Sequence, residues 1–139
     1  MEKHQYQSLA EFRYQIRLFV HFSERAAREA GLEPQHHQLL LAVKGFDSHG
    51  DGPTVGDLAD RLQLRHNSTV ELIDRMEERH MVHRRTREAD KRQVIVELTK
   101  TGENLLEALS KEHLSEISQT GPLLVSALQR LIPAMELSR

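Results

Sequence analysis

Five cationic side chains gather in a short stretch between residues 84 and 92, where only Glu88 and Asp90 carry negative charge. Guanidinium and ammonium groups donate strong hydrogen bonds to phosphate oxygens, so the cluster suits contact with a phosphate backbone. A run of charge is more often an ordinary solvated surface, and this alternative stays open for the cluster taken alone. Its members are Arg84, Arg85, Arg87, Lys91 and Arg92.

Asp90 has a different predicted task from its basic neighbours. A carboxylate in a phosphate-facing loop repels DNA, so we predict that Asp90 accepts a hydrogen bond from Arg92 and organises the turn. The arginines earlier in the stretch have no comparable acidic neighbour on their own strand. We therefore expect Arg84, Arg85 and Arg87 to have charges free for phosphates, which gives affinity with little sequence information.

A second group of polar side chains precedes the basic cluster and could contact bases. An asparagine suits adenine, and a carboxylate can accept from cytosine N4, so Asn67 and Glu71 are candidates for direct readout. A salt bridge from Glu71 to Arg75 on the same helix is an equally open alternative. The candidate groove-facing residues are Arg65, His66, Asn67, Ser68, Glu71 and Arg75.

Apolar spacing predicts a helix that turns this second group outward and a hairpin that carries the basic cluster. Thr69, Leu72, Ile73 and Met76 fall at helical spacing, and a Ser-x-x-Glu capping box starts the helix at Ser68. A strand over 81–87, a turn over 88–91 and a second strand follow. In the second strand Val94, Val96 and Leu98 alternate with Gln93, Ile95 and Glu97.

A shorter helix precedes this one. Thr54 and Asp57 give a helix-start signal, and Leu58, Ala59 and Leu62 form an apolar face. The break over 63–66 is short enough to hold the two helices as an angled pair. The order of helix, turn, groove-facing helix and basic hairpin predicts a winged helix-turn-helix, with the second helix in a DNA major groove.

These residues resemble the MarR (multiple antibiotic resistance regulator) family of transcription factors. The resemblance rests on TVGDLADRL, STVELIDRMEER, MVHR and above all Asp90-Lys91-Arg92 leading into VIVELTKTG, and it covers nearly the whole chain. Two positions depart from the family pattern. His80 stands where a glycine usually ends the recognition helix, so it must tolerate a left-handed or reworked cap. Glu71 stands where a basic or small polar residue is frequent.

The resemblance implies a mainly α fold with a small β-hairpin wing (α+β), as a single domain over 1–139. It places a DNA-binding winged unit at about 34–99 and dimerisation helices at about 8–30 and 103–137. It also implies a response to a small phenolic or anionic effector, lodged between the dimer helices and the DNA-binding unit. Arg13, Arg17, His36 and His37 could line such a cleft, with a plain surface role as the alternative for each.

The flanking regions are helical and apolar. Helices are predicted over 9–30, ended by Gly31, and over 34–46, which is apolar on more than one side and should be central. Thr99 can cap a long helix with His113 or Leu114 on its apolar face, and Gly121-Pro122 should break it before a last amphipathic segment over 123–135. Apolar helix faces of this kind are normally buried against another surface, which predicts a homodimer. The alternative is that these helices complete the core of a monomer.

Composition narrows the function further. The chain has 139 residues, a net charge of −2 and no cysteine, so its basic charge is local and disulfides or thiolate metal sites are excluded. We expect a cytoplasmic protein, since the N-terminus has no apolar run typical of a signal peptide or membrane segment. The nine histidines include possible metal-binding pairs, His80 with His83 and His113 with Glu116, but solvent-facing or capping roles are favoured and no metal is predicted.

The predicted function is therefore DNA binding. No catalytic motif appears, so an enzyme is not expected and no cofactor is predicted. We expect a homodimeric, ligand-responsive repressor that binds a pseudo-palindromic operator in double-stranded DNA. The alternative is a protein-interaction module built on the same winged fold. The salt dependence of binding distinguishes these two functions, because DNA binding weakens steeply as the salt concentration rises.

Overall fold

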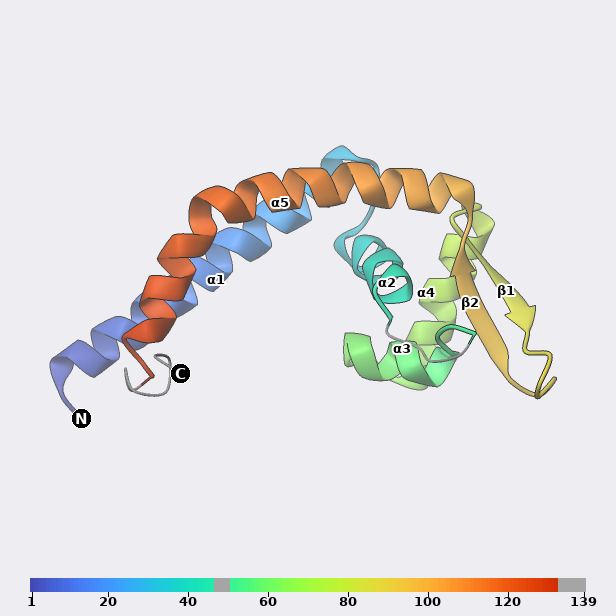
Figure 1. Ribbon diagram of the computed structural model, residues 1–139, viewed down its shortest axis with the longest axis horizontal. Helices are drawn as coiled ribbons and strands as arrows, with labels where there is room; N and C mark the ends of the chain where they lie inside the picture. Colours follow the sequence, from blue (N-terminus) through green and yellow to red (C-terminus); the bar gives the residue numbers. More distant parts are fainter. Residues whose placement is uncertain (47–50, 133–139) are drawn as a thin grey trace. The chain divides into compact units, whose positions relative to one another are not determined.

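The computed structural model describes residues 1–46 and 51–132, and the chain divides into two compact units. We call Met1–Ala26 with Ser110–Arg139 the helical unit, and Ala27–Leu109 the winged unit. The predicted fold class is confirmed, since the chain is mostly helical with one small hairpin (Figure 1). The elements are α1 (Lys3–Glu29), α2 (Pro34–Lys44), α3 (Val55–Leu62), α4 (His66–Glu78), β1 (Val82–Thr86), β2 (Val94–Leu98) and α5 (Lys100–Gln129).

Helix α3 begins at the predicted signal. Thr54 Oγ1 accepts a hydrogen bond from Asp57 N at 3.1 Å, and Asp57 Oδ2 accepts one from Thr54 N at 2.9 Å, which together form a capping box. The helix ends at Gln63, whose backbone is left-handed with φ of 54°. Only residues 63–65 separate α3 from α4, so the break is one residue shorter than predicted.

Helix α4 begins two residues before the predicted start, so the capping box assigned to Ser68 is wrong. Arg65 is the N-cap residue and makes no side-chain cap bond; its carbonyl oxygen accepts from both the backbone N (3.0 Å) and the Oγ1 (2.9 Å) of Thr69. The predicted buried face is confirmed, because Thr69, Leu72, Ile73 and Met76 are all buried. The groove-facing residues are therefore fixed by burial on the opposite side of the helix.

A tight turn at His80 connects α4 to the hairpin. His80 has φ of 59°, so a non-glycine residue does occupy the left-handed position, as the departure from the family pattern requires. His80 N donates to Glu77 O at 2.9 Å, and Met81 N donates to Met76 O at 3.0 Å. These two bonds form a Schellman motif, which satisfies the last carbonyls of the helix.

The hairpin is antiparallel, with Val82 opposite Leu98 and Thr86 opposite Val94. The expected alternation in β2 is wrong at Ile95, which is fully buried beside buried Val96, while Val94 is exposed. The reason is a third segment that covers this point. Thr54 forms a β-bridge with Ile95, and Val96 N donates to the carbonyl oxygen of Pro53 at 3.0 Å.

Helix α5 starts at the cap predicted for it and packs closely on the base of the hairpin. Thr99 Oγ1 accepts from Gly102 N at 3.1 Å and donates to His80 O at 2.6 Å. Gly102 is buried, and a Cβ atom at this position would overlap the carbonyl oxygen of Met81. At Gly102 the first turn of α5 therefore approaches the start of the hairpin with no side chain between the two backbones.

The winged unit has a core of its own. Helix α2 is central as predicted, packing on α3, α4 and β2, although it ends at Lys44 instead of Phe46. The predicted loop over 49–53 falls partly outside the described residues, at His49 and Gly50; within the described part Pro53 is buried. The largest fully buried apolar side chains of the unit are Leu39, Leu40, Leu58, Ile73, Met76, Val82, Ile95, Val96 and Leu109.

In the helical unit, α1 lies along the second part of α5 (Figure 1). His113 occupies the buried position that the sequence left open between His113 and Leu114. Its Nε2 lies 2.8 Å from Ser23 Oγ, and the rings of Phe19 and Phe22 meet its ring edge-on. Helix α1 begins at Lys3, before the predicted start at Leu9.

The break predicted at Gly121-Pro122 is wrong, because α5 continues through Pro122 to Gln129. Proline has no N–H to donate to the carbonyl of Ser118, and such a loss bends a helix more readily than it ends one. Figure 1 shows α5 bending in this part. The end of the predicted amphipathic segment, over 133–135, lies outside the described residues.

Among the described residues, no helix is long and apolar enough to cross a membrane.

Candidate nucleic-acid interface

The outer face of α4 carries the predicted groove-facing group. All six side chains are exposed, which confirms their predicted orientation, while their contact with bases stays a prediction. Glu71 and Arg75 form no ion pair with each other within the part of the chain that the structure describes, so the salt-bridge alternative is not what the structure adopts. The group is Arg65, His66, Asn67, Ser68, Glu71 and Arg75.

Arg84 is not the free cation that its strand neighbours suggested. Its Nη1 donates to Glu77 Oε1 at 2.6 Å and its Nη2 donates to Asp74 Oδ1 at 2.5 Å. Glu77 Oε2 also accepts from the backbone N of Arg84 at 3.1 Å. The expectation of a free charge is therefore wrong for Arg84, because the acidic partners come from α4 and not from the strand.

Arg85 and Arg87 also have acidic neighbours, so the same expectation is wrong for both. Arg85 pairs with Glu97 across the hairpin and donates to the carbonyl oxygen of Asp51 at 3.0 Å. Arg87 donates to Gln93 Oε1 at 2.7 Å, and its Nε lies 3.7 Å from Asp51 Oδ2. Both side chains are partly exposed, so these pairs are weak and leave the predicted phosphate contacts possible as proposals.

The tip of the hairpin is organised as predicted for Asp90. Asp90 Oδ1 accepts from both the backbone N and the Nε of Arg92, each at 3.1 Å. These two bonds hold the pKa of the Asp90 carboxyl below its ordinary value, and the bond from the Arg92 side chain contributes most. The charge of Arg87 lowers this pKa further. The Arg92 side chain is 91% exposed and Lys91 is exposed beside it, so both cations face solvent.

The sequence of the winged unit matches a known family. Residues 30–93, from the end of α1 to the turn before β2, match the sequence model of the MarR family. The matched part, 64 of the 139 residues, carries the sequence pattern of the MarR family. This confirms the resemblance carried by the Asp90-Lys91-Arg92 motif and the two helices before it. A comparison with curated proteins found no match.

Solved structures of MarR regulators share the fold. The MarR family transcriptional regulator AbsC from Streptomyces coelicolor has a TM-score of 0.75 at 20% identity, covering 99% of this chain and 95% of AbsC. MepR, a transcription regulator of the Staphylococcus aureus multidrug efflux pump MepA, has a TM-score of 0.69 at 23% identity, covering 83% and 79%. The S. aureus MepR–DNA complex gives 0.60 at 22% identity, covering 82% of each chain.

The winged unit buries two residues that were predicted to line an effector cleft or the surface. His36 and His37 are both buried, so a plain surface role is wrong for them, whereas Arg13 and Arg17 are exposed as that role requires. His36 completes the N-terminal capping box of α2, with its Nδ1 accepting from Glu33 N at 3.3 Å. The capping role favoured for histidines is thus confirmed at His36.

Sequence reasoning missed Arg79, the C-cap residue of α4. Its Nη2 donates to Gly31 O at 2.9 Å, and its Nη1 lies 3.4 Å from His36 Nδ1. Burial lowers the pKa of His36, and the Arg79 charge lowers it further. The neutral imidazole therefore joins the end of the recognition helix to the turn before α2.

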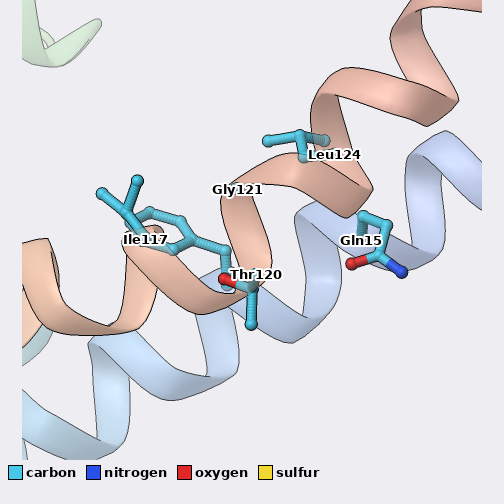
Figure 2. Close-up of a pocket in the computed structure, with 6 residues that line it drawn as sticks. Gln15, Ile117, Thr120, Gly121 and Leu124 are labelled. Atoms are coloured by element: carbon cyan, nitrogen blue, oxygen red, sulfur yellow. The ribbon is translucent and has the colours of Figure 1, made fainter.

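A pocket in the helical unit was also missed (Figure 2). It has a volume of about 160 Å³, and its polar groups already have partners: Gln15 Nε2 donates to Glu11 Oε1, and Thr120 Oγ1 donates to Glu116 O. No charged side chain lines it among the described residues. The lining residues are Gln15, Phe19, Ile117, Thr120, Gly121 and Leu124.

Proposed function

We propose that this MarR-family protein regulates transcription by binding operator DNA through its winged unit. The observation that carries the proposal is the outer face of α4, which exposes base-contacting residue types next to a hairpin whose tip exposes Lys91 and Arg92. A helix of this kind enters a major groove, and cations on the adjacent hairpin contact phosphates or the minor groove. The likeness of fold to MepR, which was solved as a complex with DNA, supports the proposed DNA binding.

We propose further that the protein acts as a homodimer. Most large apolar side chains that are exposed among the described residues lie in the helical unit; the exceptions are Leu41 and Val94 of the winged unit. Exposed apolar side chains in this number favour burial against a partner, and a second copy also supplies the second recognition helix for a pseudo-palindromic site. The exposed residues include Tyr6, Leu9, Tyr14, Leu18, Val20, Leu114, Ile117, Leu123, Val125 and Leu128.

The finer assignments follow from the family. We propose a cytoplasmic repressor, not an enzyme, whose DNA binding responds to a small phenolic or anionic effector. Arg13 and Arg17 remain candidates for an anionic group because both are exposed. The pocket of the helical unit offers an uncharged, apolar alternative for part of the ligand.

Selection of bound DNA from a random pool, followed by titration at several salt concentrations, tests the function. We expect a pseudo-palindromic site and a steep loss of affinity as salt rises, since each phosphate contact releases counterions. Replacing Asn67 or Glu71 by Ala should change base preference at one or two positions, at about 1–3 kcal/mol each. A parent protein that selects no sequence and shows no salt dependence would favour the protein-interaction alternative.

Asp90→Ala tests the organisation of the wing tip. Removing a negative charge should tighten DNA binding by simple electrostatics. We expect the reverse, because Arg92 loses both bonds that orient it while thermal stability changes little. Tighter binding of operator DNA by the variant at moderate salt would show that Asp90 is only a repulsive charge.

A further inference from the structure

Arg84 differs from the other wing arginines in the element to which it is bound. The partners of Arg85 and Arg87 lie on the hairpin or at Asp51. Arg84 instead bonds to α4, the helix that carries the base-contacting face. This guanidinium could act in two ways, either by contacting a DNA phosphate itself or by holding the hairpin in position on α4.

The contact has the geometry of a clamp. Asp74 and Glu77 stand one helical turn apart, so both carboxylates face the same direction. They take one guanidinium nitrogen each, at 2.5 and 2.6 Å, and Glu77 also accepts from the backbone N of Arg84. The Arg84 side chain is only 24% exposed, so little of it is left for a phosphate.

The position of the clamp along β1 gives it a mechanical effect. The turn at His80 and the bond from Thr99 Oγ1 to His80 O hold the base of the hairpin. Arg84 lies two residues farther along the strand than Val82, on the way to the tip. Val96, opposite Arg84 on β2, is already bonded to the carbonyl oxygen of Pro53, so the hairpin is attached to the winged unit at this level. Arg84 adds an attachment to α4 itself, on the other strand of the hairpin.

We propose that Arg84 is a positioning residue whose clamp to Asp74 and Glu77 fixes the wing on the recognition helix, so that the tip and the base-contacting face engage DNA as one rigid body. The inference rests on the proposed DNA binding. It also gives a role to two acidic side chains on a DNA-facing helix, since the guanidinium offsets one of their two negative charges where phosphates approach.

Arg84→Lys separates the two roles. A lysine is a good point-charge contact for a phosphate, but its single ammonium lacks the planar fork that spans two carboxylates. For a clamp, operator affinity should fall about five- to tenfold with an unchanged slope of log affinity against log salt. For a phosphate contact, Arg84→Lys should keep both affinity and slope. Arg130→Lys is the matched control, because Arg130 is exposed in the helical unit and outside the proposed DNA-binding face, and it should leave both quantities near those of the parent.

Asp74→Asn gives a test of opposite sign. If the carboxylate only competes with DNA for Arg84, the variant should bind DNA more tightly and with a steeper salt slope. The clamp predicts weaker binding with the slope unchanged, and Asp74→Asn should cost less in the Arg84→Lys background than in the parent. Tighter binding, or a slope changed by about one contact per half-site, would overturn the proposal.

Thermal unfolding of the parent, Arg84→Lys, Asp74→Asn and the double variant needs no DNA and keeps the proposal separate from the proposed function. Coupling between Arg84 and Asp74 in melting temperature shows that the clamp forms in solution, and additive effects would contradict it. A parent that selects no DNA sequence would instead end the proposed function and leave the coupling as a property of the fold.

Discussion

The two units bury different kinds of side chain although both are built from amphipathic helices. In the winged unit the buried positions hold large apolar groups such as Leu39, Leu40 and Ile73. In the helical unit the fully buried positions hold small or polar groups, among them Gln15, Ser23 and His113, while large apolar groups are half-buried or exposed. The winged unit can therefore be stable within one chain, whereas the helical unit needs a second surface to bury its apolar area.

The largest effect is expected in the core of the winged unit. Ile73 is fully buried on α4, so Ile73→Ala should lower the free energy of unfolding by about 2–5 kcal/mol, independently of protein concentration. Urea denaturation at two protein concentrations measures it. Leu114→Ala is the comparison in the helical unit. The free energy of unfolding that this variant loses should depend on protein concentration, because Leu114 stabilises the fold only when two chains assemble. If the loss for Ile73→Ala depended on protein concentration and the loss for Leu114→Ala did not, the helical unit and not the winged unit would be the one that is stable within a single chain.

A charge on the outer face of the helical unit should weaken assembly. Leu123 is 56% exposed, and Leu123→Glu should raise the dissociation constant of the dimer by about 30-fold, or about 2 kcal/mol, because a carboxylate would be buried without a partner. Sedimentation equilibrium gives this constant. Leu41→Glu, at an exposed leucine of the winged unit, is the control and should leave assembly unchanged. A monomeric parent, or equal effects of the two changes, would remove the distinction between the units.

The smallest effect should come from the buried imidazole of the winged unit. Because the pKa of His36 is lowered on folding, the unfolded chain binds this proton more readily than the folded one. The stability contributed by neutral His36 is therefore complete above its ordinary pKa of 6.5 and is lost as pH falls from there through the folded pKa. Melting temperatures at pH 7.5 and 5.5 should show a smaller decrease for His36→Gln than for the parent. Equal decreases would exclude His36 as a source of acid sensitivity.

Local signals in the sequence predicted much of the winged unit. The Thr54–Asp57 capping box, the buried face of α4 and the Asp90–Arg92 contact join residues at most a few positions apart, so spacing alone indicates them. The start of α4 shows the limit of such signals. Ser68 fits a capping box, but the helix begins two residues nearer the N-terminus, at His66. There the carbonyl oxygen of Arg65 accepts hydrogen bonds from the backbone N and the Oγ1 of Thr69.

Contacts between distant segments could not be predicted in this way. The partners of Arg84 lie seven and ten residues away on another element, and only the turn at His80 brings them together. Burial of Ile95 depends on the segment at Pro53 and Thr54, some 40 residues earlier. Pro122 was expected to end α5, but in a helix held by packing the lost hydrogen bond produces a bend instead.

The backbone contact between Gly102 and Met81 has a consequence for how movement travels through the protein. A side chain lying between two elements can absorb a small displacement by changing rotamer, but backbone atoms in direct contact cannot. Any shift of the first turn of α5 must therefore be transmitted in full to the start of β1.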